Sequence, residues 1–203
     1  MLDRYVRPVI DPPLNATARL IARTGITANA LTGIGFLFSL GAFAALAFQA
    51  YSWAVAFIVL SRLMDGLDGP LARQSHATDL GGYFDIVSDF IFYAGIVLFF
   101  AVGRPEMALP AAVLIFSFIG TSSSFLTYAI FAAKRGWNHE QQGRKAFFYL
   151  SGLTEGTESI AVLILICLVP DHFAWIAYIF SGLCWLTTLG RTIQAAKDFG
   201  DDK

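Results

Sequence analysis

Four aspartates lie against or inside strongly apolar sequence in the segment 63–90. Asp65 and Asp68 are three residues apart, and Asp85 and Asp89 are four residues apart. On a helix, either spacing places both carboxylates on one face. We expect two consecutive antiparallel helices joined by a short loop. The four carboxylates then converge between the end of one helix and the start of the next.

Converging carboxylates need a partner for their charge. In a low-dielectric setting, four such groups cannot all stay ionised alone. A hard divalent cation resolves the repulsion, and all-oxygen ligation suits Mg²⁺, Mn²⁺ or Ca²⁺ rather than zinc. Four acidic ligands can hold two ions, the arrangement that clamps phosphoryl oxygens during a displacement. The alternative to a metal site is a purely structural role, in which the carboxylates form ion pairs at the membrane boundary. Ionisable residues within membranes usually mark functional sites, which favours the metal site.

Residues beside the aspartates fit phosphate chemistry. Gly69 removes a side chain where a bulky anion must approach the backbone. The planar guanidinium of Arg73 can donate two hydrogen bonds to a phosphate. Arg62, one turn before Asp65, can balance the negative charge of the aspartates. A fifth aspartate, Asp79, lies outside the pattern, and we expect it to be solvated in the loop.

The composition indicates a membrane protein. The 203 residues are 56% hydrophobic and only 14% charged, whereas a soluble domain usually carries about a quarter charged residues. The net charge of −1 gives no indication of nucleic-acid binding. Two cysteines, Cys167 and Cys184, lie in apolar runs without a CxxC or His/Cys cluster, so zinc binding is not indicated.

Six apolar runs are read as transmembrane helices, each of which needs about 20 residues. They cover residues 30–50, 53–67, 82–102, 109–133, 147–169 and 173–193. Residues 1–25 alternate apolar and arginine side chains, which predicts an amphipathic interfacial helix interrupted at Pro12-Pro13 rather than a signal peptide. The predicted fold is an all-α integral membrane protein, with residues 1–203 as one domain and 26–203 as its six-helix bundle.

The basic residues predict the orientation in the membrane. With six spans, thirteen of the 14 Lys and Arg residues fall on one side, and Arg104 alone falls on the other. Loops rich in Lys and Arg stay in the cytoplasm. Both termini and the aspartates are therefore expected on the cytoplasmic side.

The aspartate segment resembles the signature of the CDP-alcohol phosphatidyltransferases, D-x2-D-G-x2-A-R followed by G-x3-D-x3-D. The matching residues are Asp65, Asp68, Gly69, Ala72, Arg73, Gly81, Asp85 and Asp89. The spacer 74–80 has seven residues, one fewer than is common, so either Gly81 or Gly82 can be the second glycine, and the x3 spacing favours Gly81. The stretch ITANALT, Ile26–Thr32, is also similar to the start of the family's first span, with Ala28 where a proline is common.

The resemblance implies a reaction and a set of roles. A CDP-linked lipid, usually CDP-diacylglycerol, binds with its pyrophosphate on two Mg²⁺ or Mn²⁺ ions, a small alcohol attacks the β-phosphorus, and CMP leaves. Asp65, Asp68, Asp85 and Asp89 ligate metal, and Asp89 is also the general base. The CDP-binding residues implied are Asp65, Gly69, Ala72, Arg73, Gly81 and Asp85. A homodimer in the inner membrane of a bacterium is expected.

The acceptor alcohol is less well defined by the sequence. The basic set Lys134, Arg135, Arg144, Lys145 and Arg191 suits the phosphate of glycerol 3-phosphate or inositol phosphate, although the positive-inside bias explains it equally well. Glu155 and Glu158, roughly 12–18 Å into the fifth span, suit an amine such as serine, or pair with Arg144 or Arg191. We favour a polyol phosphate such as glycerol 3-phosphate. Serine, inositol or choline as acceptor, or a CDP-choline-type donor, are alternatives.

A small ion-coupled transporter is the competing class of function. Transporter sites lie near the middle of the bilayer, between repeated halves of the chain. Here the carboxylates cluster at one end of the helices, and no internal repeat is visible. The sequence therefore favours an enzyme.

Overall fold

The computed structural model describes residues 3–74, 77–137 and 153–200, in which every regular element is a helix. The elements are α1 (Asp3–Ala22), α2 (Ala28–Ala47), α3 (Tyr51–Gln74), α4 (Asp79–Gly103), η1 (Pro105–Met107), α5 (Ala108–Lys134), α7 (Gly156–Leu168), η2 (Pro170–His172) and α8 (Phe173–Phe199). The all-α prediction is confirmed for these residues.

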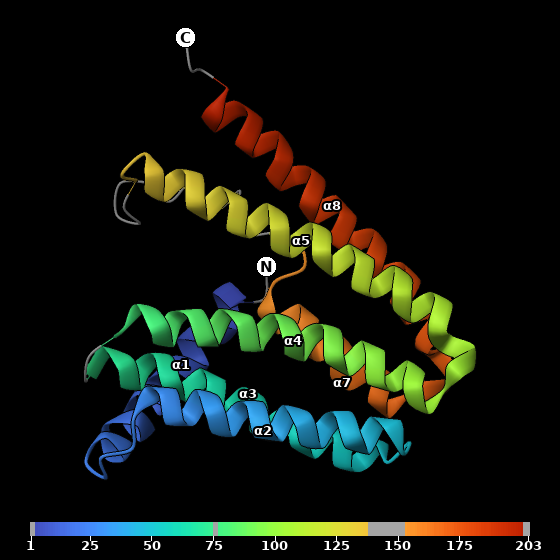
Figure 1. The fold of residues 1–203 in the computed structure, drawn as a ribbon, viewed down its shortest axis with the longest axis horizontal. Coiled ribbons are helices and arrows are strands. Elements are labelled where there is room, and N and C mark those ends of the chain that lie inside the picture. The colour runs from blue at the N-terminus through green and yellow to red at the C-terminus, as the bar shows by residue number, and fades with distance from the viewer. Residues whose placement is uncertain (1–2, 75–76, 138–152, 201–203) are drawn as a thin grey trace.

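The long helices run up and down in sequence order (Figure 1). The α2–α3, α4–α5 and α7–α8 turns lie at one end, and the α3–α4 connection and the end of α5 lie at the other. Helix α2 packs along α3 and α4, α5 packs along α8, and α7 contacts α3, α4 and α8. Because α3 ends where α4 begins, residues late in α3 face residues early in α4.

An apolar core joins α2, α3, α4, α5, α7 and α8. Phe92, Ile96, Leu114 and Phe173 have no exposed side-chain surface, although they come from three different helices. The Phe100 ring stacks on the Phe173 ring with centroids 4.1 Å apart. This packing fixes α4 against α8 in the half of the bundle away from the aspartates.

Four helical segments are long and apolar enough to cross a membrane: Ala28–Ala47, Asp79–Gly103, Pro105–Lys134 and Pro170–Phe199. The predicted count of six spans is not confirmed. Helix α3 has sufficient length, but Arg62, Asp65 and Asp68 interrupt its apolar surface. Helix α7 has 13 residues, and residues 147–152 of the predicted fifth span lie outside the described part of the chain.

The N-terminal helix is continuous. Helix α1 passes through Pro12 and Pro13, so the predicted interruption there was wrong. Proline fixes a helix-compatible φ and weakens a helix mainly by losing a hydrogen bond and by a clash. Contacts with the rest of the molecule offset that penalty, because Ala18 is fully buried and packs with Leu67 and Leu71 of α3.

Polar contacts tie together the turns at the end away from the aspartates. The Arg104 guanidinium lies 2.8 Å from Glu106 Oε1 and 2.8 Å from Asp171 Oδ1. Gln49 Nε2 donates to the Gly103 carbonyl at 2.7 Å. The three turns at this end are thus connected without using any of the signature residues.

Candidate active site

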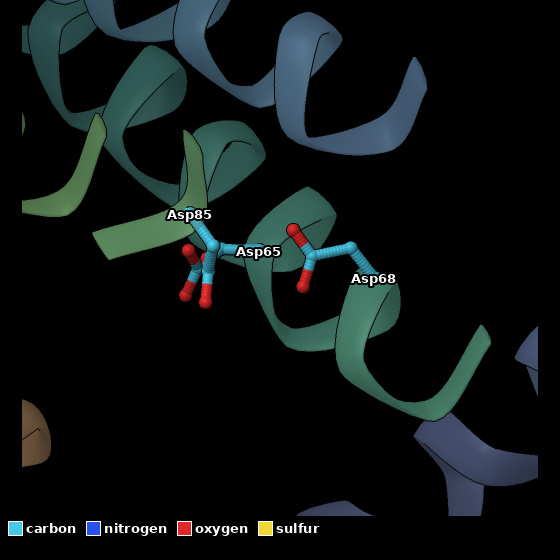
Figure 2. Close-up of side chains that lie close together, drawn as sticks. All are labelled: Asp65, Asp68 and Asp85. Carbon is cyan, nitrogen blue, oxygen red and sulfur yellow. The ribbon is translucent and has the colours of Figure 1, made fainter. Parts of the chain in front are cut away.

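Three of the four signature aspartates meet where α3 ends and α4 begins (Figure 2). One carboxylate oxygen from each of Asp65, Asp68 and Asp85 lies within 4.8 Å of the other two. Asp65 and Asp85 approach each other across the two helices, and Asp68 points toward them from the next turn of α3. We call these three residues the carboxylate trio. They show the predicted convergence of the two helices.

The donor set of the trio fits a hard divalent cation. Carboxylate oxygens are the ligands that Mg²⁺ and Mn²⁺ prefer. The three oxygens lie within 4.8 Å of one another, so these are the side chains that would hold such an ion. Asp68 is buried and the other two are partly buried, so a cation there also relieves repulsion that water screens poorly.

Asp68 has a hydrogen-bond partner on α2. Thr32 Oγ1 donates to Asp68 Oδ2 at 2.6 Å. A hydrogen bond to a carboxylate is among the stronger ones in proteins, and it orients the oxygen that accepts it. Thr32 thus fixes the most buried carboxylate of the trio. The sequence analysis missed this role, although Thr32 ends the family-like stretch Ile26–Thr32.

Asp89 pairs with Arg62, which also reaches Asp65 of the trio. Arg62 Nη1 donates to Asp89 Oδ1 at 2.5 Å, and the same nitrogen lies 3.5 Å from Asp65 Oδ2. Among the described residues, the group of mutually close carboxylates contains Asp65, Asp68 and Asp85 without Asp89. The predicted roles of Asp89 as metal ligand and base stay predictions.

Two glycines allow the helices around the site to approach. A Cβ on Gly81 would lie 2.6 Å from Asn29 Oδ1, whereas a Cβ on Gly82 would meet nothing within 4 Å. Of the two glycines that the short spacer left open, Gly81 is therefore the one where an added Cβ would push against a side chain of α2. A Cβ on Gly35 of α2 would lie 3.1 Å from Met64 Cβ, next to Asp65.

The other signature residues lie on the last turns of α3. Gly69 leaves open space apart from the Arg73 guanidinium, which would be 3.6 Å from an added Cβ. Ala72 is partly buried and Arg73 is exposed. All the residues predicted to bind CDP thus lie at the same end of the bundle as the carboxylate trio.

The basic residues predicted to bind the acceptor do not form one set. Lys134 is exposed at the end of α5, and Arg135 donates to the carbonyls of Asp198 (2.9 Å) and Phe199 (3.3 Å) at the end of α8. Arg191 is buried and donates to the Thr121 carbonyl at 3.0 Å, several turns earlier along α5. Arg144 and Lys145 lie outside the described residues.

The two glutamates lie at the start of a helix, Glu155 just before it and Glu158 in its first turn, rather than deep inside a longer one. Glu155 is the N-cap of α7 and forms a reciprocal capping box with Glu158, in which the Glu155 amide donates to Glu158 Oε2 at 3.3 Å. Residues 153–155 are not helical, so the prediction of a helix over 147–169 was wrong there. The capping box makes Glu155 the residue before the first turn, and α7 begins at Gly156. The predicted pairing of these glutamates with Arg144 or Arg191 stays a prediction.

Comparisons with known proteins agree with this arrangement. The family model of CDP-alcohol phosphatidyltransferase matches residues 25–190. Inner membrane protein YnjF of Escherichia coli (strain K12) is 47% identical over 192 residues, which cover 94% of this chain and 93% of that protein. Archaetidylinositol phosphate synthase of Pyrococcus horikoshii is 34% identical over 99 residues, 48% of this chain and 53% of that protein.

A solved structure shares the fold. The crystal structure of Mycobacterium tuberculosis phosphatidylinositol phosphate synthase (PgsA1) with CDP-DAG bound aligns with a TM-score of 0.71 at 16% sequence identity. The alignment covers 90% of this chain and 93% of that one. At this identity the likeness concerns the fold alone.

Proposed function

Since the chain belongs to the CDP-alcohol phosphatidyltransferase family, we propose that it transfers a phosphatidyl group from CDP-diacylglycerol to a polyol phosphate and releases CMP. The observation that carries this proposal is the carboxylate trio, held at the junction of α3 and α4 inside a complete family signature. Phosphoryl transfer needs positioning and charge neutralisation more than covalent help from the protein.

Asp65, Asp68 and Asp85 are the residues that would hold the divalent cations. When bound, two Mg²⁺ or Mn²⁺ ions neutralise the pyrophosphate oxygens and make the acceptor hydroxyl more acidic. Asp89, which the family pattern also makes a metal ligand, accepts the hydroxyl proton. The acceptor oxygen forms a bond to the β-phosphorus while the bond from that phosphorus to the CMP oxygen breaks, and CMP leaves with the electron pair. Gly69, Ala72, Arg73 and Gly81 line the CDP moiety.

The relatives support a polyol phosphate as acceptor. Two of them are named as an archaetidylinositol phosphate synthase and a phosphatidylinositol phosphate synthase, whose products contain inositol phosphate. Inositol phosphate and glycerol 3-phosphate share a phosphate and a free hydroxyl. The candidate cations for such a phosphate are either Arg191, buried on α8, or Lys134 and Arg135 at the end of α5, because the two groups lie several turns apart. Arg144 and Glu155 are the other two residues that we propose for binding the acceptor.

We place the protein in the inner membrane of a bacterium, in line with the name of its Escherichia coli relative. The charge bias of the sequence supports a cytoplasmic active site and cytoplasmic termini. In this arrangement α1 lies at the membrane surface, α3 and the segment containing α7 act as the second and fifth of six spans, and two copies form a homodimer.

An acceptor screen tests the proposed function. Purified protein, CDP-diacylglycerol and Mg²⁺ or Mn²⁺ are mixed in turn with inositol phosphate, glycerol 3-phosphate, inositol, serine and choline, and CMP is measured. We expect CMP with a polyol phosphate and none when EDTA is present. CMP only with serine, inositol or choline would overturn the proposed acceptor. No CMP with any acceptor would overturn CDP-diacylglycerol as donor, and CDP-choline would be tested next.

A further inference from the structure

Helix α1 packs against the signature segment of α3, which we define as residues 65–73. Figure 1 shows α1 running obliquely across the end of the bundle where α3 ends. Leu14 and Ala18 of α1 pack with Leu67 of α3 in an apolar cluster that is separate from the main core. Because Leu67 comes two residues after Asp65, α1 supports the signature segment from the side opposite that carboxylate.

The contact between α1 and α3 leaves little room. A Cβ on Gly66 would lie 3.2 Å from Leu14 Cδ1, and Ala18 has no exposed surface. Gly66 directly follows Asp65 in the chain, so a displacement of α1 also displaces a member of the carboxylate trio. The position of the signature segment therefore depends on where α1 lies.

The outer face of α1 is apolar as well, but it is exposed. Tyr5, Val9 and Leu20 are 71%, 73% and 64% exposed. They share one face because they follow one another by four and eleven residues, about one and three turns. The buried Ala18 comes nine residues after Val9, about two and a half turns, and so lies on the opposite side. An exposed face of large apolar side chains indicates a second partner for α1.

The charges beside this outer face indicate an anionic partner. Arg19 and Arg23 are exposed and flank Leu20 in the sequence. The exposed Asp11 comes two residues after Val9, so it lies on the other side of the helix. Apolar side chains next to arginines are typical of helices that lie among the headgroups of an anionic membrane surface. The oblique course of α1 suits a helix that lies along such a surface (Figure 1).

We propose that α1 binds anionic lipid headgroups with its outer face and thereby holds the signature segment in the position that the reaction requires. Its inner face transmits the position of the lipid surface to α3 through the packed cluster. The lipid composition of the membrane surface then regulates turnover. This regulation rests on the proposed function, whereas the binding of α1 to lipid does not.

The first test measures contact between α1 and lipid without using turnover. In a variant without the buried Cys167 and Cys184, a fluorescent label is attached to Val9→Cys or to Asp11→Cys. The protein is placed in phosphatidylcholine nanodiscs, with or without phosphatidylserine, that contain lipids with a nitroxide at the headgroup. The nitroxide should quench the label at position 9 strongly, more so with phosphatidylserine, and the label at position 11 weakly. Equal quenching at the two positions, or none at position 9, would overturn the binding of this face to lipid.

The second test measures kcat, as CMP release, in the same two kinds of nanodisc. We expect a several-fold higher kcat with phosphatidylserine. Arg19→Gln/Arg23→Gln should keep the kcat seen in phosphatidylcholine but lose the increase, because the attraction to anionic headgroups is lost. Lys197→Gln removes an exposed basic side chain from the last turn of α8 and should keep the increase. An increase that persists in the arginine variant would show that the lipid acts elsewhere and would overturn the regulation.

A matched pair of alanine variants tests whether α1 acts through the signature segment. Ala18→Leu adds atoms inside the packed cluster and shifts α1 away from α3. Its kcat should fall about 10-fold, because the carboxylates are displaced, and the ratio of kcat with and without phosphatidylserine should approach one. Ala16→Leu makes the same change at an exposed position and should alter neither quantity.

The ratio separates positioning from a loss of stability. A protein that is merely destabilised would lose kcat in both kinds of nanodisc and keep the ratio, and this result would overturn the positioning role. If no acceptor supports CMP release, the proposed function fails by itself. The quenching result then still decides the binding of α1 to lipid, and binding of labelled CDP replaces kcat in the comparison of the variants.

Discussion

At the scale of single residues, the four signature aspartates differ in their partners. Asp65 and Asp85 face each other, Asp68 is held by Thr32, and Asp89 is held by Arg62. Aspartates that share a helix face in the sequence therefore have different surroundings in the structure. The roles proposed for these residues predict different consequences when each is changed.

Asp89→Asn should abolish turnover while CDP-diacylglycerol binding is kept. An amide cannot accept the acceptor proton, and loss of a general base typically lowers the rate about 10²- to 10⁴-fold. CMP release measures the chemistry, and displacement of labelled CDP measures binding. Asp79→Asn is the matched control, because Asp79 is an exposed aspartate outside the signature. Normal turnover in Asp89→Asn would rule out the base role.

Thr32→Val should weaken metal binding without removing it. Valine keeps the shape of threonine but cannot donate to Asp68 Oδ2, and a single hydrogen bond contributes about 0.5–1.5 kcal/mol. The Mn²⁺ concentration for half-maximal activity should rise about 2- to 10-fold, since 1.4 kcal/mol corresponds to a factor of ten. Thr32→Ser keeps the hydroxyl and should behave as the parent protein. An unchanged metal requirement in Thr32→Val would show that the hydrogen bond does not orient the site.

At the scale of elements, the site depends on close packing between α2 and α3. Thr32 and Gly35 lie on one stretch of α2 that faces the aspartate-bearing turn of α3. The polar second half of α3 stays helical because its charged groups find partners on α2 and α4. Sequence patterns predicted the limits of α5 well, as 109–133 against Ala108–Lys134. They ended the second apolar run, 53–67, at residue 67, whereas α3 continues to Gln74.

Gly35→Ala should destabilise the protein, whereas Gly33→Ala should not. In a helix, replacing glycine by alanine gains about 1 kcal/mol of intrinsic stability. At Gly33 nothing lies within 4 Å of an added Cβ, but at Gly35 the Cβ would be 3.1 Å from Met64 Cβ and 3.4 Å from the Ser61 carbonyl oxygen. Overpacking at such a contact costs about 1–3 kcal/mol.

Thermal unfolding of the two glycine variants in detergent checks this comparison. The melting temperature of Gly35→Ala should fall below that of Gly33→Ala, and its CMP release should fall as well, because Asp65 lies on the displaced turn. Equal melting temperatures would mean that α2 and α3 can separate slightly without lowering the stability of the protein, and would contradict this prediction.

At the scale of the whole molecule, the antiparallel helices place the candidate active site at one end of the bundle and the ion pairs that join the turns at the other. The trio lies at the α3–α4 end, and Arg104 ties together turns at the other end. Only the first end contains the signature residues. If the molecule crosses the membrane as proposed, the two ends face different compartments.

Cysteine labelling tests this orientation. In a variant without the buried Cys167 and Cys184, single cysteines replace the exposed residues Asp79 and Glu106, one at each end of α4. A membrane-impermeant maleimide added to intact spheroplasts should label position 106 and should label position 79 only after permeabilisation. The reverse pattern would place the aspartates outside the cytoplasm and contradict the positive-inside assignment.

The sequence by itself determined the residues of the site and the helices that carry them. Spacing of three and four residues within apolar helices is a local property, so Asp65, Asp68, Asp85 and Asp89 were found without any tertiary contact. The same local reasoning could not decide the acceptor set. Arg135 follows α5 and contacts the end of α8, whereas Arg191 lies on α8 and contacts Thr121 within α5, and only the packing of the two helices separates these positions.

Only the tertiary structure decided which partner each aspartate has. Thr32 is 36 residues from Asp68, and Arg62 is 27 residues from Asp89. Such pairs depend on how α2, α3 and α4 rotate and approach one another, which the glycine contacts at Gly35 and Gly81 set. Helical periodicity fixes the face on which a side chain lies, but not the residue that faces it from another helix. The separation of Asp89 from the carboxylate trio follows from that packing.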